Sequence, residues 1–504
     1  MFDIIDDFLN RITMYRLVLF YLIFLLGIAA ILGQFKLLPF SPLALLFSTG
    51  VLLLLSWGSN KLFAAFLQVQ TNVESVYITA LILALIISPP ASGAYIAALP
   101  FLFWAALLAQ ASKYVLNISH KHIFNPAALA VAITALALSR SANWWVGTSS
   151  MLIFVVLGGL LVIRKVQRFD AAVAFVAAAA VAAFALSPVN PWVTVYKLAL
   201  FSPVFFFAAI MLTEPLTMPP TLDGRLSYGI LVGLLFAPYT HIGGLYFTPE
   251  LALLAGNIFS YIISPKGRQV LRLKEKRPAG SDIYDFVFEP ERGFKFQAGQ
   301  YMEWTLGHPN TDNRGNRRYF TLASSPTEKQ VLLGVKFYDN SSSYKRRLLA
   351  MQPGETILAG QLAGDFTLPD DPKQKLAFIA GGIGITPFRS MLKYLADRGD
   401  RRSVVLFYSN RRAGEAVYQD VLTEAGKKID LKVVQTITDQ APSDWQGYRG
   451  YFTSRLIMRE LPDFAERTFY VSGSHTMVEA FKKNLAELGV SRTKIKTDFF
   501  PGLA

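Results

Sequence analysis

The distribution of apolar residues divides the chain near residue 264. Between residues 15 and 263, long apolar runs follow one another, and charged residues lie mainly between the runs. A helix needs about 20 predominantly apolar residues to cross a bilayer, and several runs approach that length. We therefore predict about ten membrane-spanning helices, several of which Pro or Gly interrupts. The predicted ranges are 14–33, 39–57, 75–88, 94–111, 125–139, 146–164, 170–187, 196–213, 226–240 and 249–264.

From Lys266 onward, a charged residue appears every few positions, as in a water-soluble protein. Apolar strands are predicted at 375–380, 403–408, 431–437 and 468–472, and helical stretches separate them. Strands that alternate with helices in this way favour a doubly wound α/β domain. The second half of the chain is long enough for two modest domains.

Composition limits the chemistry that these elements can carry. The chain has no cysteine, which excludes disulfides, a cysteine-ligated iron–sulfur cluster and a thiol nucleophile. Redox chemistry would then use an organic cofactor or a haem, and we predict no metal site. The net charge of +14 would suit nucleic-acid binding. Many of the cations, however, flank the apolar runs, so we predict a lipid bilayer and no nucleic acid as partner.

The basic residues between the apolar runs also predict an orientation. With the N-terminus in the cytoplasm, most of them lie on the cytoplasmic side, where membrane proteins carry their excess of Lys and Arg. The cytoplasmic set is Arg11, Arg16, Lys61, Lys113, Lys121, Arg164, Lys165, Arg168 and Arg225, and the outer set is Lys36, Arg140 and Lys197. We therefore predict a multi-pass protein of the cell inner (cytoplasmic) membrane with both termini in the cytoplasm.

A glycine-rich turn carries the first chemical signal in the soluble half. A predicted strand leads into Gly381, Gly382 and Gly384, and a helix is predicted to begin at Thr386 and Pro387. Such a turn presents bare backbone N–H groups and a helix N-terminus to an anion. The pyrophosphate of a dinucleotide is its usual occupant, so we predict that these residues bind one.

An arginine, an aromatic ring and a hydroxyl form the second signal, in Arg318-Tyr319-Phe320-Thr321. On an extended strand, Arg318 could pair with a pyrophosphate, Phe320 could stack on a flavin ring and Thr321 could hydrogen-bond near flavin N5. An ordinary strand with a basic start would show the same residues, so the segment alone leaves both interpretations open.

Taken together, residues 266–504 resemble the ferredoxin–NADP⁺ reductase superfamily. The segment from Arg318 to Ser324 matches its Arg-x-Tyr/Phe-Ser/Thr-x-x-Ser motif. Further matches follow in order at Val335-Lys336-Phe337, Ser341-Ser342-Ser343-Tyr344, Gly360 to Phe366, the glycine turn, Phe407 to Arg412 and Tyr470 to Val478. The resemblance implies an antiparallel barrel that binds FAD at 265–370, followed by a doubly wound domain that binds NAD(P)H at 371–504.

The same resemblance implies individual contacts with the cofactors. Those with FAD and the dinucleotide would be made by Val335, Lys336, Ser342, Ser343, Gly473 and Met477. Phe320, Thr321 and Phe500 would act at the reacting rings, although Phe500 could equally close the C-terminal core. Ser472 replaces a cysteine that relatives place near the nicotinamide.

The choice between NADH and NADPH stays open. Arg411 and Arg412 follow a predicted strand and could bind a 2′-phosphate. An arginine pair at a strand end could equally face solvent.

In the membrane half there is an apparent internal repeat. Pro89-Pro90 and Glu214-Pro215 end corresponding spans, and Asn125 and Asn257 lie in corresponding later segments. The copies would insert with opposite orientations, and broken helices at such points form sites near the membrane midplane. Pro and Asn could also simply cap helices here.

This half resembles the flavin-carrying membrane subunits of sodium-translocating NADH:quinone oxidoreductase and of Rnf complexes. The matching segments are His122-Ile123-Phe124-Asn125-Pro126-Ala127, Gly147-Thr148-Ser149-Ser150 and Met211 to Thr217. The resemblance implies two inverted halves and a flavin site, to which we assign Asn125, Thr148 and Glu214. The family's Ser-Gly-Ala-Thr attachment motif does not occur in this chain. A second flavin, FMN or riboflavin, would therefore bind non-covalently.

These patterns together predict a transmembrane electron-transfer domain at 1–264 joined to an NAD(P)H-dependent flavin oxidoreductase. Electrons would pass from NAD(P)H through FAD to a flavin or quinone in the membrane domain, and on to an extracytoplasmic acceptor. The alternative is a nicotinamide-regulated or redox-coupled ion transporter, in which Glu74, Glu214 and Asp223 could line the path. Each of these residues could also simply lie at the membrane interface.

A haem-based reductase fused to membrane helices fits less well. That design stacks pairs of His within two helices to ligate the haems. The chain has 5 His, and only His120, His122 and His241 lie in the membrane half, near predicted helix ends.

Overall fold

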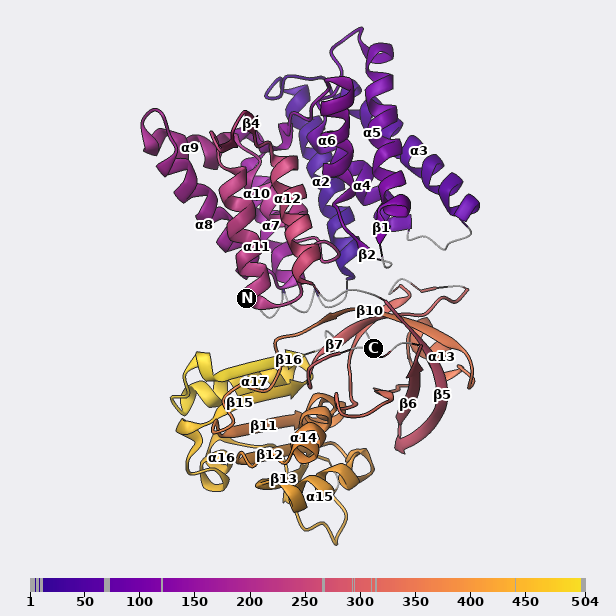
Figure 1. The fold of residues 1–504 in the computed structure, drawn as a ribbon, viewed down its shortest axis with the longest axis vertical. Helices are drawn as coiled ribbons and strands as arrows, with labels where there is room; N and C mark the ends of the chain where they lie inside the picture. Colours follow the sequence, from indigo (N-terminus) through magenta and orange to yellow (C-terminus); the bar gives the residue numbers. More distant parts are fainter. Residues whose placement is uncertain are drawn as a thin grey trace. The chain divides into compact units, whose positions relative to one another are not determined.

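The computed structural model describes residues 12–67, 73–118, 121–264, 268–291, 293, 295–309, 311, 312, 315–439 and 441–499, together with Ile5 and Leu9. Contacts divide the chain into a helical unit, residues 1–267, and a second unit, residues 268–504. The second unit contains two six-stranded sheets (Figure 1).

The helical unit has a helix within each range that the sequence predicts to span a membrane. The helices are α2 (Met14–Gln34), α3 (Pro42–Leu67), α4 (Val73–Ile86), α5 (Tyr95–Val115), α6 (Pro126–Leu138), α7 (Leu152–Val166), α8 (Phe169–Ala185), α9 (Pro191–Phe201), α10 (Val204–Phe206), α11 (Leu222–Phe236) and α12 (Pro249–Ile263). Proline sets several of their starts. Asn125, for example, caps α6 with its side chain, and Pro126 occupies the first turn, where no N–H is needed.

Helix length supports fewer spans than predicted. Within the described residues, four helical segments are long and apolar enough to cross a bilayer: Met14–Gln34, Pro42–Leu67, Tyr95–Val115 and Ser149–Val166. The pair Pro191–Phe201 and Val204–Met211, bent by 62°, would make a fifth. The apolar helices α4, α6, α8 and α12 have only 10–17 residues. The structure therefore supports four or five candidate spans, because proline and turn residues shorten the others.

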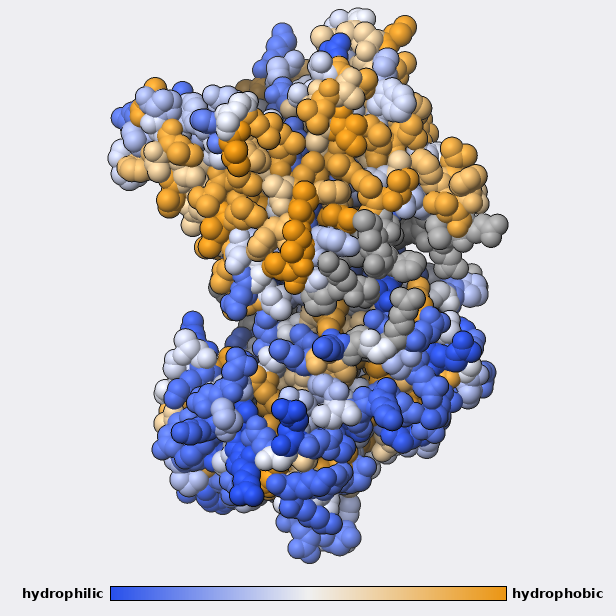
Figure 2. All heavy atoms as spheres, viewed as in Figure 1, coloured by the Kyte–Doolittle hydropathy of each residue, from blue (hydrophilic) through white to orange (hydrophobic). Residues whose placement is uncertain are grey.

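The surface of the helical unit is apolar. Figure 2 shows orange hydrophobic residues over it and mostly blue hydrophilic residues over the second unit. Large side chains that are exposed in the helical unit include Phe20, Leu43, Leu54, Phe66, Ile96, Leu136 and Ile153. Extended apolar surface of this kind is typical of a membrane or protein interface rather than of contact with water.

The first sheet of the second unit is antiparallel, in the order β8-β7-β10-β5-β6-β9. Its strands are β5 (Gln269–Gly280), β6 (Ile283–Pro290), β7 (Tyr301–Thr305), β8 (Arg317–Thr321), β9 (Val331–Lys336) and β10 (Thr356–Ala363), and the short helix α13 (Ser343–Leu349) follows β9. Trp304, Phe286 and Phe288 fill its core. This sheet confirms the antiparallel domain that the sequence predicts.

The second sheet is parallel, in the order β14-β13-β12-β11-β15-β16. Its elements are β11 (Leu376–Gly381), α14 (Thr386–Arg398), β12 (Val404–Asn410), α15 (Gln419–Lys428), β13 (Leu431–Ile437), β14 (Tyr448–Arg449), α16 (Ser454–Glu460), β15 (Thr468–Gly473), α17 (His475–Glu487) and β16 (Ile495–Phe499). The chain leaves β11 on one side and returns to β15 on the other. Ligands bind at the carboxyl ends of strands at such a switch point.

Candidate functional site

The glycine turn lies at the carboxyl end of β11, at this switch point. Gly382–Ile385 form a short 3-10 segment, and α14 begins directly after them with Pro387 in its first turn. Gly382 has a φ of +52°, and a Cβ built there would meet no atom within 4 Å. Glycine tolerates this conformation because it has no Cβ. The turn therefore presents open backbone at Gly382.

Two neighbouring glycines are required for a different reason. A Cβ on Gly384 would lie 2.5 Å from the carbonyl oxygen of Ser472, at the end of β15. A Cβ on Gly381 would collide with the sulfur of Met477, which also lies against Gly473. These residues thus pack the ends of β11 and β15 together, which explains the glycines at 381 and 384 without a ligand.

Strand β8 brings together the arginine and the aromatic ring of the second motif. The Arg318 guanidinium lies over the Tyr344 ring, 5.1 Å from its centroid. The Phe320 ring lies 6.1 Å from the same ring. Arg318 is buried and donates from Nη1 to the carbonyl oxygens of Gly315, at 3.2 Å, and Arg317, at 2.6 Å. These contacts hold the Arg318 guanidinium in place next to the rings of Tyr344 and Phe320.

Unpartnered hydroxyls complete this part of the site. Thr321 Oγ1 and the Tyr344 hydroxyl are buried and have no hydrogen-bond partner within the described residues. Burial raises the pKa of the Tyr344 hydroxyl well above its ordinary value, so it stays protonated. Buried polar groups nearly always have partners. The nitrogen and oxygen atoms of a flavin ring would supply them, so these residues fit the cofactor.

The loop before α13 is held by the protein itself. Ser342 caps α13, accepting from Lys345 N at 3.3 Å. Ser343 Oγ accepts from Asp312 N at 3.0 Å and lies 2.9 Å from His308 Nε2. The sequence predicts that Ser342 and Ser343 bind FAD, but in the structure their side chains form hydrogen bonds within the loop and to the start of α13.

The two residues of β9 that the sequence predicts to bind FAD, Val335 and Lys336, also have side chains that contact other parts of the protein. Val335 is buried in the sheet core. The Lys336 ammonium forms an ion pair with Glu415 at 2.8 Å, which links the two sheets. A contact of either residue with FAD would use the main chain.

At the carboxyl end of β12 lie Arg411 and Arg412, both exposed. Arg411 forms an ion pair with Asp439 at 3.2 Å. Their place beside β11 suits a ribose-phosphate contact, and the solvent-facing interpretation fits equally well.

Ser472 and Asp498 form a pair that the sequence motifs do not reveal. They are direct partners in the register of β15 and β16. Ser472 Oγ and Asp498 Oδ2 are buried, and neither has a hydrogen-bond partner within the described residues. Burial raises the pKa of Asp498 from 3.8 to about 7. Ser472 lies against the glycine turn, because its carbonyl oxygen occupies the place that a Cβ on Gly384 would take. Phe500, expected nearby, is outside the described residues.

Comparisons with known proteins agree with this geometry. The family model described as the oxidoreductase NAD-binding domain matches residues 378–483. The stachydrine N-demethylase reductase subunit Stc4 of Rhizobium meliloti is 29% identical over 231 residues, which are 45% of this chain and 64% of that protein. The flavohemoprotein of Bacillus subtilis is 25% identical over 234 residues, which are 45% of this chain and 58% of that protein.

The second unit is a reductase module of the ferredoxin–NADP⁺ reductase type. It binds FAD and NAD(P)H and is an oxidoreductase. The chain spans less than two thirds of the length of these curated relatives. Among solved structures, the Amycolatopsis cytochrome P450 reductase GcoB is 23% identical with a TM-score of 0.42, and the match covers 46% of this chain and 69% of GcoB.

Outside the reductase module, the helical unit contains a buried polar cluster. Asn125 Nδ2 donates to Glu214 Oε2 at 2.9 Å, and Thr217 Oγ1 donates to the same oxygen at 3.1 Å. Asn257 Oδ1 accepts from Asn125 N at 2.9 Å, so the two repeat-related asparagines meet. Thr148 lies in a separate turn between two short 3-10 segments. The structure therefore joins Asn125 to Glu214.

Proposed function

We propose that this chain is a membrane-bound NAD(P)H dehydrogenase that passes electrons from NAD(P)H through FAD to a flavin or quinone in the helical unit. The observation that carries the proposal is the joining, in one chain, of a reductase module and a unit whose described residues include four helices long and apolar enough to cross a bilayer. A soluble reductase needs no such helices, and this supports an acceptor site in or across the membrane.

Within the reductase module, each residue group has a defined task. NAD(P)H supplies a hydride, and FAD can accept the electron pair and release electrons singly. The backbone at Gly382 and the start of α14 would hold the dinucleotide pyrophosphate. Arg318 would offset the charge of the FAD pyrophosphate, and Thr321 would donate a hydrogen bond near flavin N5.

On the membrane side, we propose a second, non-covalently bound flavin near the cluster of Asn125 and Glu214, with Thr148 as a further contact. The resemblance to the flavin-carrying subunits supports this assignment. A buried amide and a half-buried carboxylate in an apolar unit also mark a functional site by default, because such groups are costly inside a membrane. The proposed topology spans the inner membrane with both termini in the cytoplasm and delivers electrons to an extracytoplasmic acceptor.

Flavin stoichiometry in the detergent-purified full chain tests the proposal. The expected result is FAD together with FMN or riboflavin in equal amounts, with both flavins bleached in turn by NADH or NADPH under anaerobic conditions. FAD alone would restrict the acceptor to a quinone or another external molecule. A preparation that binds no FAD would overturn the proposal.

Redox-coupled ion transport is a second candidate, favoured by the half-buried carboxylate of Glu214, which accepts a hydrogen bond from buried Asn125 in the apolar unit. Proteoliposomes that contain the full chain and an ion-sensitive dye would test it. NAD(P)H-driven ion uptake that is lost in Glu214→Gln, with flavin content retained, would support transport. Electron transfer without ion movement would exclude it.

A further inference from the structure

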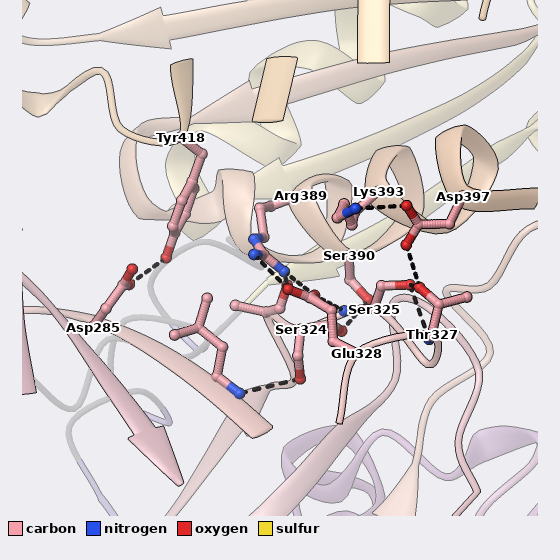
Figure 3. A network of polar contacts seen from close by, with 12 residues as sticks. Asp285, Ser324, Ser325, Thr327, Glu328, Arg389, Ser390, Lys393, Asp397 and Tyr418 are labelled. Atoms are coloured by element: carbon pink, nitrogen blue, oxygen red, sulfur yellow. Dashed lines mark hydrogen bonds and ion pairs between the residues drawn. The ribbon is translucent and has the colours of Figure 1, made fainter. Parts of the chain in front are cut away.

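The loop of residues 323–328 joins the two strands of the proposed flavin site, β8 and β9. It packs against the first turns of α14, the helix that begins at the glycine turn (Figure 3). A single hydrophobic cluster continues across this junction. It includes Leu332 of β9, Ala323 and Phe366 from the connections after β8 and β10, and Phe388 and Met391 of α14. The dinucleotide and flavin elements therefore meet in a shared core.

Arg389 on α14 makes the central polar contact of this junction. Its Nη2 donates to Glu328 Oε1 at 2.9 Å, and its Nη1 donates to Glu328 Oε2 and, at 3.0 Å, to the carbonyl oxygen of Ala323. Glu328 Oε2 also accepts from Ser325 N at 2.6 Å. One guanidinium thus fixes both ends of the loop. Only 6% of Arg389 is exposed.

Neighbouring hydrogen bonds connect α14 through the loop to β9. Ser390 Oγ donates to the carbonyl oxygen of Ser324 at 2.6 Å. Ser324 Oγ in turn accepts from Leu332 N of β9 at 3.1 Å. The Arg389 guanidinium also lies 5.8 Å from the centroid of the Tyr418 ring. Movement of α14 would therefore be passed to the segment that directly follows Thr321.

We propose that Arg389 is a positioning residue for hydride transfer. It holds the end of β8 at a fixed position relative to α14, the helix whose start would bind the dinucleotide. The proposal rests on the NAD(P)H-to-FAD reaction proposed above. Arg389 would touch neither cofactor. It would act because the donor is bound at the start of α14 and the acceptor beside Thr321, and its two bonds to Glu328 fix one relative to the other.

The distance between the hydride donor and the flavin affects the rate of hydride transfer more than the affinity for NAD(P)H. Reacting atoms must approach within about 3–3.5 Å, and a displacement of about 1 Å can reduce a rate by about 100-fold. We therefore expect the limiting rate of flavin reduction to fall by about 10–100-fold in Arg389→Met. The dissociation constant of NAD(P)H and the FAD content should change little, because the backbone at Gly382 and the Arg318 side chain are untouched.

Anaerobic stopped-flow reduction of the purified full chain tests this, together with Tm and FAD content. Arg389→Lys keeps the charge and loses the two-pronged geometry, so its rate should fall between those of the wild type and Arg389→Met; it also serves if Arg389→Met does not fold. Lys482→Met is the control, because it removes an exposed ion pair with Glu479 on α17, at 2.8 Å.

The double variant Arg389→Met/Glu328→Leu separates positioning from simple instability. A buried ion pair that loses one partner leaves an uncompensated charge, whereas an apolar replacement of both is often tolerated. We expect the double variant to regain Tm but not the rate of flavin reduction. Recovery of both, or a rate unchanged in Arg389→Met and Arg389→Lys, would overturn the inference. Wild-type protein that NAD(P)H does not reduce would instead refute the proposed function.

Discussion

At the scale of single residues, the chemistry of the reductase module is marked by buried polar atoms. Thr321 Oγ1, Ser472 Oγ and Asp498 Oδ2 have no hydrogen-bond partner within the described chain. All three lie in the last two residues of their strands, which are β8, β15 and β16. Because unsatisfied buried groups are costly, ligand atoms are their natural partners. This scale is therefore where binding and proton chemistry can be tested.

Arg318→Ala should weaken FAD binding by about 10–100-fold, since a hydrogen bond to a charged group contributes about 1.5–3 kcal/mol. FAD per chain after gel filtration and flavin fluorescence titration measure the effect. Arg317→Ala is the matched control, because its Nη1 lies 3.4 Å from Glu303 on the adjacent strand. Full FAD retention in Arg318→Ala would remove the pyrophosphate role.

Asp498 should give the reaction a pH dependence near neutrality. Its pKa is raised by burial from 3.8 to about 7, so the folded protein favours the protonated carboxyl. We expect the rate of flavin reduction to titrate near pH 7 in the wild type, and Asp498→Asn to abolish this step.

Stability should follow the same ionisation. The stabilising contribution of the protonated form is present below about pH 4 and is lost as the pH rises towards about 7, because the unfolded chain releases this proton first. Tm measured across this range should therefore fall more steeply in the wild type than in Asp498→Asn. Parallel Tm curves would contradict the burial of a protonated carboxyl.

At the scale of elements, the junctions between strands and helices decide the site. The turn between β11 and α14 contains glycines of two kinds. Gly382 faces open space, whereas the place of a side chain on Gly384 is filled by Ser472. The same motif therefore contains one position that suits a ligand and one that serves internal packing.

Substitution of Gly382 should mainly affect dinucleotide binding, whereas substitution of Gly384 should mainly affect stability. Gly382→Val should raise the KM for NAD(P)H at least tenfold, with a loss of stability of about 1 kcal/mol for its left-handed backbone. Gly384→Val should lower Tm strongly, because the valine would collide with β15. Steady-state kinetics and thermal unfolding distinguish them. A normal KM in a folded Gly382→Val protein would exclude dinucleotide binding at this turn.

At the scale of the whole molecule, the chain combines a unit suited to lipid with one suited to water. On the face that Figure 2 shows, mostly hydrophobic residues lie over the helical unit and mostly hydrophilic residues lie over the reductase module, and the exposed side chains of the helical unit include many Phe, Leu and Ile residues. A reductase fixed at a membrane can reach acceptors that a soluble one cannot. The helical unit that would receive the electrons also contains the hydrogen bond between Asn125 and Glu214.

The full chain should behave as an integral membrane protein. After an alkaline carbonate wash it should stay in the membrane pellet and require detergent for release, because several helices are long enough to span. A peripheral protein that is expressed in parallel provides the control. Release by carbonate alone would show that the helices lie on the surface or associate with another protein.

The local patterns of the sequence were sufficient for the division into two halves, the approximate position of most helices in the first half, and the strand–turn–helix at β11 and α14. The range 196–213, predicted as one span, instead falls on two helical segments, Pro191–Phe201 and Val204–Met211, bent by 62°. Apolar periodicity, proline and glycine act over a few residues, so these features can be predicted without a fold. Helix length was less predictable: α4, α6, α8 and α12 are shorter than full spans. In α6, for example, Asn125 caps the start and Pro126 occupies the first turn.

Only the tertiary structure decided which distant residues meet. Ser472 faces Asp498 because β15 and β16 are adjacent and in register, and Arg389 contacts Glu328 because α14 packs on the loop after β8. Position 384 must be glycine because the Ser472 carbonyl oxygen occupies the place of a Cβ. Asn125 donates a hydrogen bond to Glu214, which is 89 positions away in the chain. Such contacts join segments that are far apart in the chain. They leave no periodic trace in the sequence, because packing and strand order, rather than local backbone preference, create them.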